Sequence, residues 1–340
     1  MSAGRLRVDG PDDADSTAIP SVPAPIQGLG RAQSLAQVLE IVLPSAGLQL
    51  GYDDLMGLSG LAFRTPPWPD LPGVSRDEAL AVVDAMNEAL EPPLSVHGAE
   101  EPRSPDEALA LVAACVDEGR PCVALGWGSV KERWSVIAGY DRTGERLLGH
   151  CVLAEARDAY ESWPPELSLL LTVPAEAKLR GGTVLLDAVE RAHRRWVSEG
   201  RARYARWIAT LDEREDEAGN SRQAAGLREA DTLQEAAVEL LADARGAATE
   251  FLSGLAESVE GNRAAWLAHA AESYARLVEM LEGRGAAPLS EAALAGLQDA
   301  RWRDAWARRL EQMAELEEAA ATALRRSASA EFPPEQVLEP

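Results

Sequence analysis

The sequence predicts an α+β domain at the amino terminus followed by an all-α helical bundle. From residue 28 to residue 171, short helical patterns alternate with short apolar runs, which is typical of a domain that mixes helices and strands. After Gly181-Gly182 the apolar residues recur every three to four positions instead of every second position, which indicates helices alone. The chain of 340 residues is also longer than one ordinary hydrophobic core needs, so two domains are expected.

Composition sets the expected domain limits. The stretch 1–21 is rich in Asp, Gly and Pro and has no apolar period, so it cannot bury enough apolar surface to offset the entropy of ordering. It is expected to be a tail. The mixed domain is assigned to 22–180 and the helical bundle to 181–330, and 331–340 forms a second expected tail.

The elements of the mixed domain follow from its patterns. Helices are predicted over 34–43, 52–56, 76–90 and 105–118. Strands are predicted over 122–126, 134–140, 146–152 and 168–173. The turn residues Asp141-Arg142-Thr143-Gly144 are expected to join the second and third of these strands as a hairpin.

Four amphipathic helices are predicted after the Gly-Gly pair. Their apolar stripes run over 185–211, 233–255, 267–281 and 294–324, and polar linkers such as 213–221 and 283–287 separate them. This arrangement favours an antiparallel bundle. Trp302 and Trp306 lie on one helical face, and we expect them to pack in the core rather than to form a ligand site.

One predicted helix is rich in arginine. Its cations are interleaved with Trp196, Tyr204 and Trp207, a pattern that superficially resembles a nucleic-acid surface. These aromatic residues lie on the apolar stripe, so we favour a solvated basic face that pairs with carboxylates such as Glu213 and Asp216. The arginines are Arg191, Arg194, Arg195, Arg201, Arg203 and Arg206.

Charge and cysteine content narrow the partners and the compartment. The formal net charge of −23 repels phosphate backbones and anionic headgroups, so neither nucleic acid nor a membrane is an expected partner. No run approaches the roughly 18 apolar residues of a membrane span, and the first residues lack the apolar core of a secretory signal. Three cysteines without a repeated spacing fit a reducing compartment, so a cytoplasmic protein is expected.

No cofactor or metal is expected. Gly28-Leu29-Gly30 lacks the third glycine and the preceding strand of a dinucleotide site, and no phosphate-binding loop with its lysine occurs. The four histidines and three cysteines have no metal-ligand spacing. Cys115 lies late in a helix, Cys122 lies in a strand, and Cys151 and His150 face opposite ways along a strand, so none of the thiols is expected to be activated.

Three segments carry a family resemblance. They are 52–64, which contains the string LMGLSGLAFR, then Gly119-Arg120-Pro121-Cys122-Val123-Ala124, and the strand and turn 134–141. Together they resemble the papain-like domain of the bacterial C39-peptidase-like proteins that include the amino-terminal domain of butirosin biosynthesis protein H. The resemblance covers roughly 26–173, and members of this group often carry a helical second domain.

The resemblance implies a cysteine nucleophile at the start of the first long helix and a histidine base from a central strand. This sequence has Ser34 as the nearest nucleophilic side chain, and its strand opens with Glu132-Arg133-Trp134. Neither arginine nor tryptophan accepts a proton at neutral pH. Gln27 matches the position of an oxyanion donor, and Asp141 lies near that of an orienting residue.

The expected function is therefore that of a catalytically degenerate papain-like protein, a binding or protein-interaction module in specialised metabolism with a small molecule, peptide or protein partner. The candidate cleft consists of Gln27, Ser34, Trp127, Trp134 and Asp141. Of these, Gln27, Ser34, Trp134 and Asp141 should converge in space, and Trp127 and Trp134 are expected to flank the cleft. Gly126 and Gly128 would allow a ligand to come close. In the papain-like arrangement, Ser34 should face Trp134.

Alternatives remain open at this point. Both tryptophans can pack under the sheet instead of flanking a cleft, and Ser34 can merely cap its own helix. The alternative function is that of an acyltransferase or amide hydrolase that uses Ser34 or an unaligned group. A nucleophile and base within about 3 Å of each other, or joined through one water, would favour the enzyme.

Overall fold

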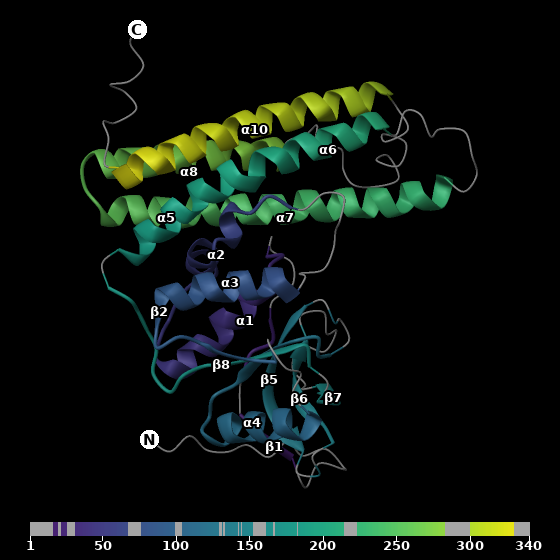
Figure 1. Ribbon diagram of the computed structural model, residues 1–340, viewed down its shortest axis with the longest axis vertical. Coiled ribbons are helices and arrows are strands. Elements are labelled where there is room, and N and C mark those ends of the chain that lie inside the picture. Colours follow the sequence, from purple (N-terminus) through teal and green to yellow (C-terminus); the bar gives the residue numbers. More distant parts are fainter. Residues whose placement is uncertain are drawn as a thin grey trace. The chain divides into compact units, whose positions relative to one another are not determined.

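The computed structural model divides the chain into two compact units. Unit 1 comprises Met1–Leu55 and Gly73–Val184, and unit 2 comprises Met56–Pro72 and Leu185–Pro340. An antiparallel sheet with helices forms the first part of the chain and helices form the rest, which is the mixed α+β architecture that the sequence predicts (Figure 1). The structure describes residues 16–19, 22–25, 31–66, 76–98, 104–128, 131, 133–141, 143, 145–151, 161–165, 167–181, 183–213, 223–282 and 300–329.

The helices of unit 1 begin and end within a few residues of the predicted limits. They are α1 (Ser34–Val42), α3 (Arg76–Ala89) and α4 (Pro105–Asp117), and α2 (Tyr52–Ser59) crosses from unit 1 into unit 2. Ser104 starts α4 with a capping box, because its hydroxyl accepts from the Glu107 N–H while the Glu107 carboxylate accepts from the Ser104 N–H. Local chemistry therefore fixes where this helix begins.

Unit 1 contains a seven-stranded antiparallel sheet. Its order is β3-β8-β4-β5-β6-β7, with β1 paired to β5. All four predicted strands are present, as β4, β5, β6 and β8. The strands are β1 (Ser16–Ala18), β3 (Ser95–His97), β4 (Cys122–Leu125), β5 (Trp134–Asp141), β6 (Leu147–Cys151), β7 (Glu161–Trp163) and β8 (Leu169–Thr172), and β2 (Leu90–Glu91) pairs separately with β9 (Lys178–Leu179).

Residues 16–18 correct the predicted tail. They form β1, in which Thr17 lies opposite Tyr140 of β5. The segment is too short for a recognisable alternation, and it adopts a strand because β5 extends beyond β4 and offers unpaired main-chain groups there. The other residues of the two predicted tails, apart from Ile19, lie outside the described part of the chain.

The register of the sheet separates its two faces. Cys122 lies opposite Ile137, and both belong to a core cluster with Val112 and Cys115 of α4. Because successive side chains of a strand point to opposite faces, Val136 faces away from α4. Helix α1 also packs on β4 and β5.

Unit 2 is a helical assembly whose long helices lie side by side (Figure 1). Helix α7 packs against α8, α8 packs against α10, and α10 packs against α6. As expected, Trp306 is buried in this core, and its ring stacks on Trp302 with centroids 6.0 Å apart. The helices are α5 (Val184–Arg195), α6 (Arg201–Glu213), α7 (Gln223–Ser258), α8 (Asn262–Glu282) and α10 (Ala300–Ser329), and a π-helical turn, Trp196–Gly200, joins α5 to α6.

The segment 56–72 belongs to unit 2, although the sequence places it in the mixed domain. Phe63 packs against Phe251 and Tyr274, with ring centroids 6.2 Å and 6.0 Å away. The apolar pattern of residues 56–63 indicates that they are buried but does not show which helices cover them. Packing against α7 and α8 decides the assignment.

The arginine-rich stretch matches its predicted role in part. Arg194, Arg201 and Arg206 are exposed, and ion pairs join Arg194 to Glu190 and Arg201 to Glu318. Arg195 and Arg203 pair with Glu199, but together with Arg191 they also donate to main-chain carbonyl oxygens of residues 58–65, which the sequence does not predict. The expected carboxylate partners Glu213 and Asp216 have side chains outside the described part of the structure.

Candidate functional site

Ser34 contacts the main chain of Trp134, the residue that the resemblance implies it should face. The Trp134 main-chain N–H donates to Ser34 Oγ at 3.2 Å, and the two residues are 4% and 1% exposed. Ser34 is the first residue of α1 and Trp134 opens β5, so the packing of α1 on β5 produces the contact. The hydroxyl thereby serves as an acceptor for a buried main-chain N–H, a group that needs a hydrogen-bond partner.

Ser34 does not cap its own helix, which was the alternative interpretation. The N-cap of α1 is Gln33, whose side chain makes no capping hydrogen bond. The Gln33 main-chain N–H donates to the Tyr52 hydroxyl at 3.1 Å. The start of α1 is therefore fixed by contacts with β5 and α2 rather than by a local cap.

Arg133 occupies the position next to Trp134 where the resemblance implies the base. Its guanidinium donates to the carbonyl oxygen of Ala32 at 2.8 Å. A guanidinium stays protonated throughout the pH range of protein chemistry and has no acceptor. Arg133 and Trp134 thus both hold the segment that leads into α1, and neither can remove a proton from Ser34.

Asp141 does not join this site, contrary to the prediction. It lies at the other end of β5 from Trp134, which puts the two residues about 23 Å apart at 3.3 Å per strand residue. Its carboxylate accepts from the N–H groups of Glu145 at 3.0 Å and Arg146 at 3.1 Å, so it closes the β5–β6 hairpin. The predicted strand over 134–140 is long enough to place Asp141 far from Trp134. Gln27 lies outside the described residues.

Trp127 and Trp134 do not flank one cleft. Trp127 is fully buried in the cluster under α4 with Ala124 and Ile137. Trp134 is three residues before Ile137 on the same strand, so it points to the opposite face of the sheet. The alternative, that both tryptophans pack against the sheet, describes them better.

Gly126 and Gly128 serve the fold rather than a ligand. Both have a positive φ, +83° and +90°. A Cβ on Gly126 would overlap Ser168, and a Cβ on Gly128 would lie 2.6 Å from the Cys151 sulfur. The space beside these glycines, which was predicted to admit a ligand, is occupied by the side chains of Ser168 and Cys151.

The thiols of Cys115 and Cys122 interact with each other. A hydrogen bond from Cys122 lowers the pKa of Cys115 to about 7, with a further contribution from the positive charge of Arg120. The same hydrogen bond and burial raise the pKa of Cys122. This direction differs from the expectation that no thiol has a depressed pKa, which considered only the position of Cys115 in its helix and not its contact with Cys122 of β4.

His150 and Cys151 do not form a dyad, as expected for neighbouring strand residues. Cys151 Sγ lies 3.2 Å from Ser135 Oγ, whereas His150 Nε2 is 3.1 Å from the main-chain oxygen of Val22 and donates to it. Burial lowers the pKa of His150, which keeps the imidazole neutral. Among the described residues, no cluster of three or more His, Cys, Asp or Glu side chains could hold a metal.

A cavity of about 550 Å³ lies beside α1 in unit 1. Its wall is largely apolar and proline-rich, and its charged residues are the ion pair of Arg31 and Glu40, 2.7 Å apart. Gln37, which is 3% exposed, also lines it and donates through Nε2 to the Arg31 carbonyl oxygen at 3.0 Å. The carbonyl oxygen of the Gln37 side chain is buried and has no hydrogen-bond partner within the described part of the chain. Sequence reasoning missed Gln37 because nothing distinguishes it from other helical glutamines.

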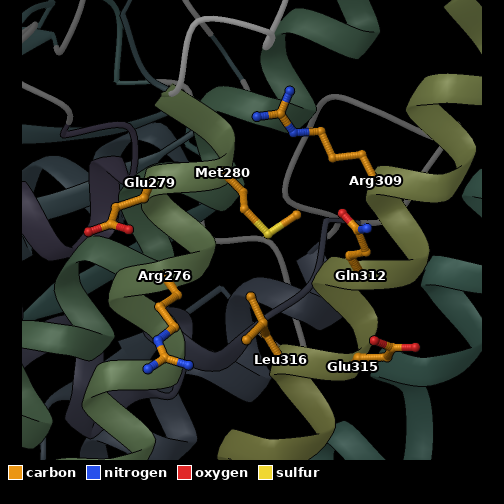
Figure 2. Close-up of a pocket in the computed structure, with 7 residues that line it drawn as sticks. All are labelled: Arg276, Glu279, Met280, Arg309, Gln312, Glu315 and Leu316. Atoms are coloured by element: carbon orange, nitrogen blue, oxygen red, sulfur yellow. The ribbon is translucent and has the colours of Figure 1, made fainter.

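A second depression, of about 620 Å³, lies between α8 and α10 of unit 2 (Figure 2). Met280 and Leu316 point into it, and Arg276, Glu279 and Arg309 surround them. Arg276 is paired with Glu272 on its own helix. Charges of both signs at an open surface favour no particular ligand.

Comparison with known proteins identifies no family for this chain. No protein-family model matches the chain, and no curated protein matches it. Within the described residues, no helix is both long enough and apolar enough to cross a membrane. The chemistry of the site therefore carries the functional argument.

Proposed function

We propose that this protein is a catalytically inactive papain-like protein whose unit 1 acts as a binding module. The observation that carries the proposal is the hydrogen bond between the Trp134 N–H and Ser34 Oγ. At the position of a nucleophile, the hydroxyl is buried and holds the main chain of β5. At the position of a base, Arg133 holds the main chain before α1.

Catalysis by Ser34 would need a base in hydrogen-bond contact with its hydroxyl. Within the described part of the chain, the hydrogen bond of Ser34 Oγ is to a main-chain N–H, which is a donor. Asp141 is committed to a hairpin turn, and His150 is bound to Val22. These contacts argue against the alternative of an acyltransferase or amide hydrolase that uses Ser34.

The cavity beside α1 supports binding of a small molecule. Its volume of about 550 Å³ lies within the range of about 300–1,000 Å³ that ligand pockets occupy. Arg31 and Glu40 neutralise each other, so the wall carries no net charge. An uncharged and mainly apolar molecule is the ligand class that such a wall favours, and a role in specialised metabolism is consistent with this class.

The experiment is native mass spectrometry of the full chain purified from its host, which weighs any molecule carried along. Ala24 lines the cavity, so Ala24→Trp should fill part of it and abolish the bound mass. Ala81→Trp, at an exposed position of α3, is the matched control and should retain it. A bound mass that Ala24→Trp leaves unchanged would contradict the proposal.

A second measurement tests for remaining catalysis. The wild-type chain and Ser34→Ala should hydrolyse an activated aryl ester at the same background rate, because among the described residues the Ser34 hydroxyl contacts a main-chain N–H and not a base. A rate that is well above background and is lost in Ser34→Ala would instead establish the acyltransferase or hydrolase alternative.

A further inference from the structure

One face of α1 forms a wall of the cavity in unit 1. Gln37, Glu40 and Ile41 line the cavity and lie three and four residues apart along the helix, so they share that face. Gln37 is buried. Its amide must therefore find its hydrogen-bond partners inside the protein or on a molecule that enters the cavity.

One hydrogen bond fixes the orientation of the Gln37 amide. Its Nε2 donates to the main-chain oxygen of Arg31 at 3.0 Å. Exchange of the amide nitrogen and oxygen would bring two carbonyl oxygens together, because an amide oxygen cannot donate. The atom left buried without a partner in the described part of the chain is therefore the acceptor Oε1. A buried acceptor without a donor costs free energy, and a donor on a bound molecule would remove that cost.

The ion pair in the cavity wall has no acceptor to spare. Glu40 uses both of its oxygens, because Oε2 accepts from Arg31 Nη1 at 2.7 Å and Oε1 accepts from the Tyr52 main-chain N–H at 3.1 Å. The Arg31 guanidinium also lies 4.7 Å from the centre of the Tyr52 ring. Among the described residues of the wall, Gln37 Oε1 is thus the buried polar side-chain atom that still lacks a partner.

The wall also has few free donors. The Ser45 hydroxyl donates to the Val42 carbonyl oxygen at 2.7 Å, and the Gly119 N–H donates to that of Val116 at 2.9 Å. Four described lining residues are prolines, which have no N–H: Pro23, Pro25, Pro44 and Pro121. A molecule that brings its own N–H or O–H group complements such a wall, whereas a molecule with acceptors alone does not.

We propose that Gln37 determines the specificity of this cavity, and that its Oε1 accepts a hydrogen bond from an N–H or O–H group of a neutral, mainly apolar molecule. The inference rests on the binding function proposed for unit 1 and adds the chemical group that the bound molecule carries. Indole belongs to this class, because it combines flat apolar rings with one N–H donor. Indene has nearly the same shape, with a CH₂ group in place of the N–H.

Isothermal titration calorimetry of the full chain with indole and with indene tests the inference. Wild type should bind indole at least about tenfold more tightly than indene, because indene leaves Gln37 Oε1 without a donor. The preference should disappear in Gln37→Met. Gln37→Glu is the matched control: it also loses the bond to the Arg31 oxygen but keeps an acceptor, so it should retain the preference. Far-UV circular dichroism reports whether each variant keeps the wild-type helix content.

The outcomes separate this inference from the proposed function. Equal binding of indole and indene to wild type would overturn the inference alone, and this comparison needs no variant to fold. Loss of the preference in folded Gln37→Glu as well as in Gln37→Met would also overturn it, because the preference would then depend on the contact with Arg31. The binding function itself fails if neither molecule binds wild type, or if Ala24→Trp binds both as wild type does.

Discussion

Arg245 and Glu317 form an ion pair 2.6 Å long although their side chains are only 0% and 2% exposed. The Tyr204 hydroxyl donates to Glu317 at 3.2 Å, and the Arg245 guanidinium also lies 5.4 Å from the centre of the Tyr274 ring. Burial raises the pKa of Glu317, and Arg245 opposes that rise. The pair is thus a dehydrated charged contact whose two members depend on each other.

Arg245→Met should lower the free energy of unfolding by about 3–5 kcal/mol, because it leaves the Glu317 carboxylate buried without its cation. Urea denaturation followed by circular dichroism measures this loss. The control is Arg276→Met, whose ion pair with Glu272 is exposed and should matter by less than about 1 kcal/mol. Equal losses of stability for the two substitutions would show that the buried pair contributes no more than the exposed pair.

Ser34→Ala should lower the free energy of unfolding by about 1–3 kcal/mol, because the buried Trp134 N–H loses its acceptor. Ser45→Ala is the matched control, since Ser45 is exposed and bonds only to the Val42 carbonyl oxygen nearby. Its expected effect is smaller. If Ser34→Ala proves as mild as the control, the N–H of Trp134 must find another partner.

His150 should make the protein less stable in acid. Burial lowers the pKa of His150 below its ordinary value of about 6.5, so both states are neutral above that pH. As the pH falls below about 6.5, the unfolded chain takes up a proton first, and stability is lost until the folded pKa is reached. Thermal unfolding at about pH 5 and about pH 7 should differ more for wild type than for His150→Gln. If His150→Gln shows the same difference between the two pH values as wild type, His150 does not cause the loss of stability in acid.

Cys115 should react with iodoacetamide with a midpoint near its pKa of about 7, although its 5% exposure makes the reaction slow. Cys122→Ala removes the hydrogen bond that stabilises the thiolate, so the midpoint should move upward. Mass spectrometry of the peptides at several pH values gives the midpoint, with Cys151 as an internal comparison. A midpoint that stays in place after Cys122→Ala would mean that the two thiols are not hydrogen-bonded.

The sequence by itself determined the helices and strands of unit 1 and the helical nature of the second half. These depend on local spacing, as in β4, and on local chemistry, as in the Asp141 turn and the Ser104 capping box. Apolar period and turn residues act over a few positions, so they can be read without knowledge of the rest of the chain. The separation of Asp141 from Ser34 could also be predicted from the sequence, because the length of a strand fixes the distance between its ends.

Tertiary structure decided which surfaces meet. The pattern of residues 56–66 shows an apolar segment but does not indicate that Phe63 packs against Phe251 and Tyr274. An arginine on a helix likewise gives no sign of whether it faces water or, like Arg245, a buried carboxylate and distant carbonyl oxygens. Periodicity identifies the face of an element that must be covered, and only the packing of elements far apart in sequence determines what covers it.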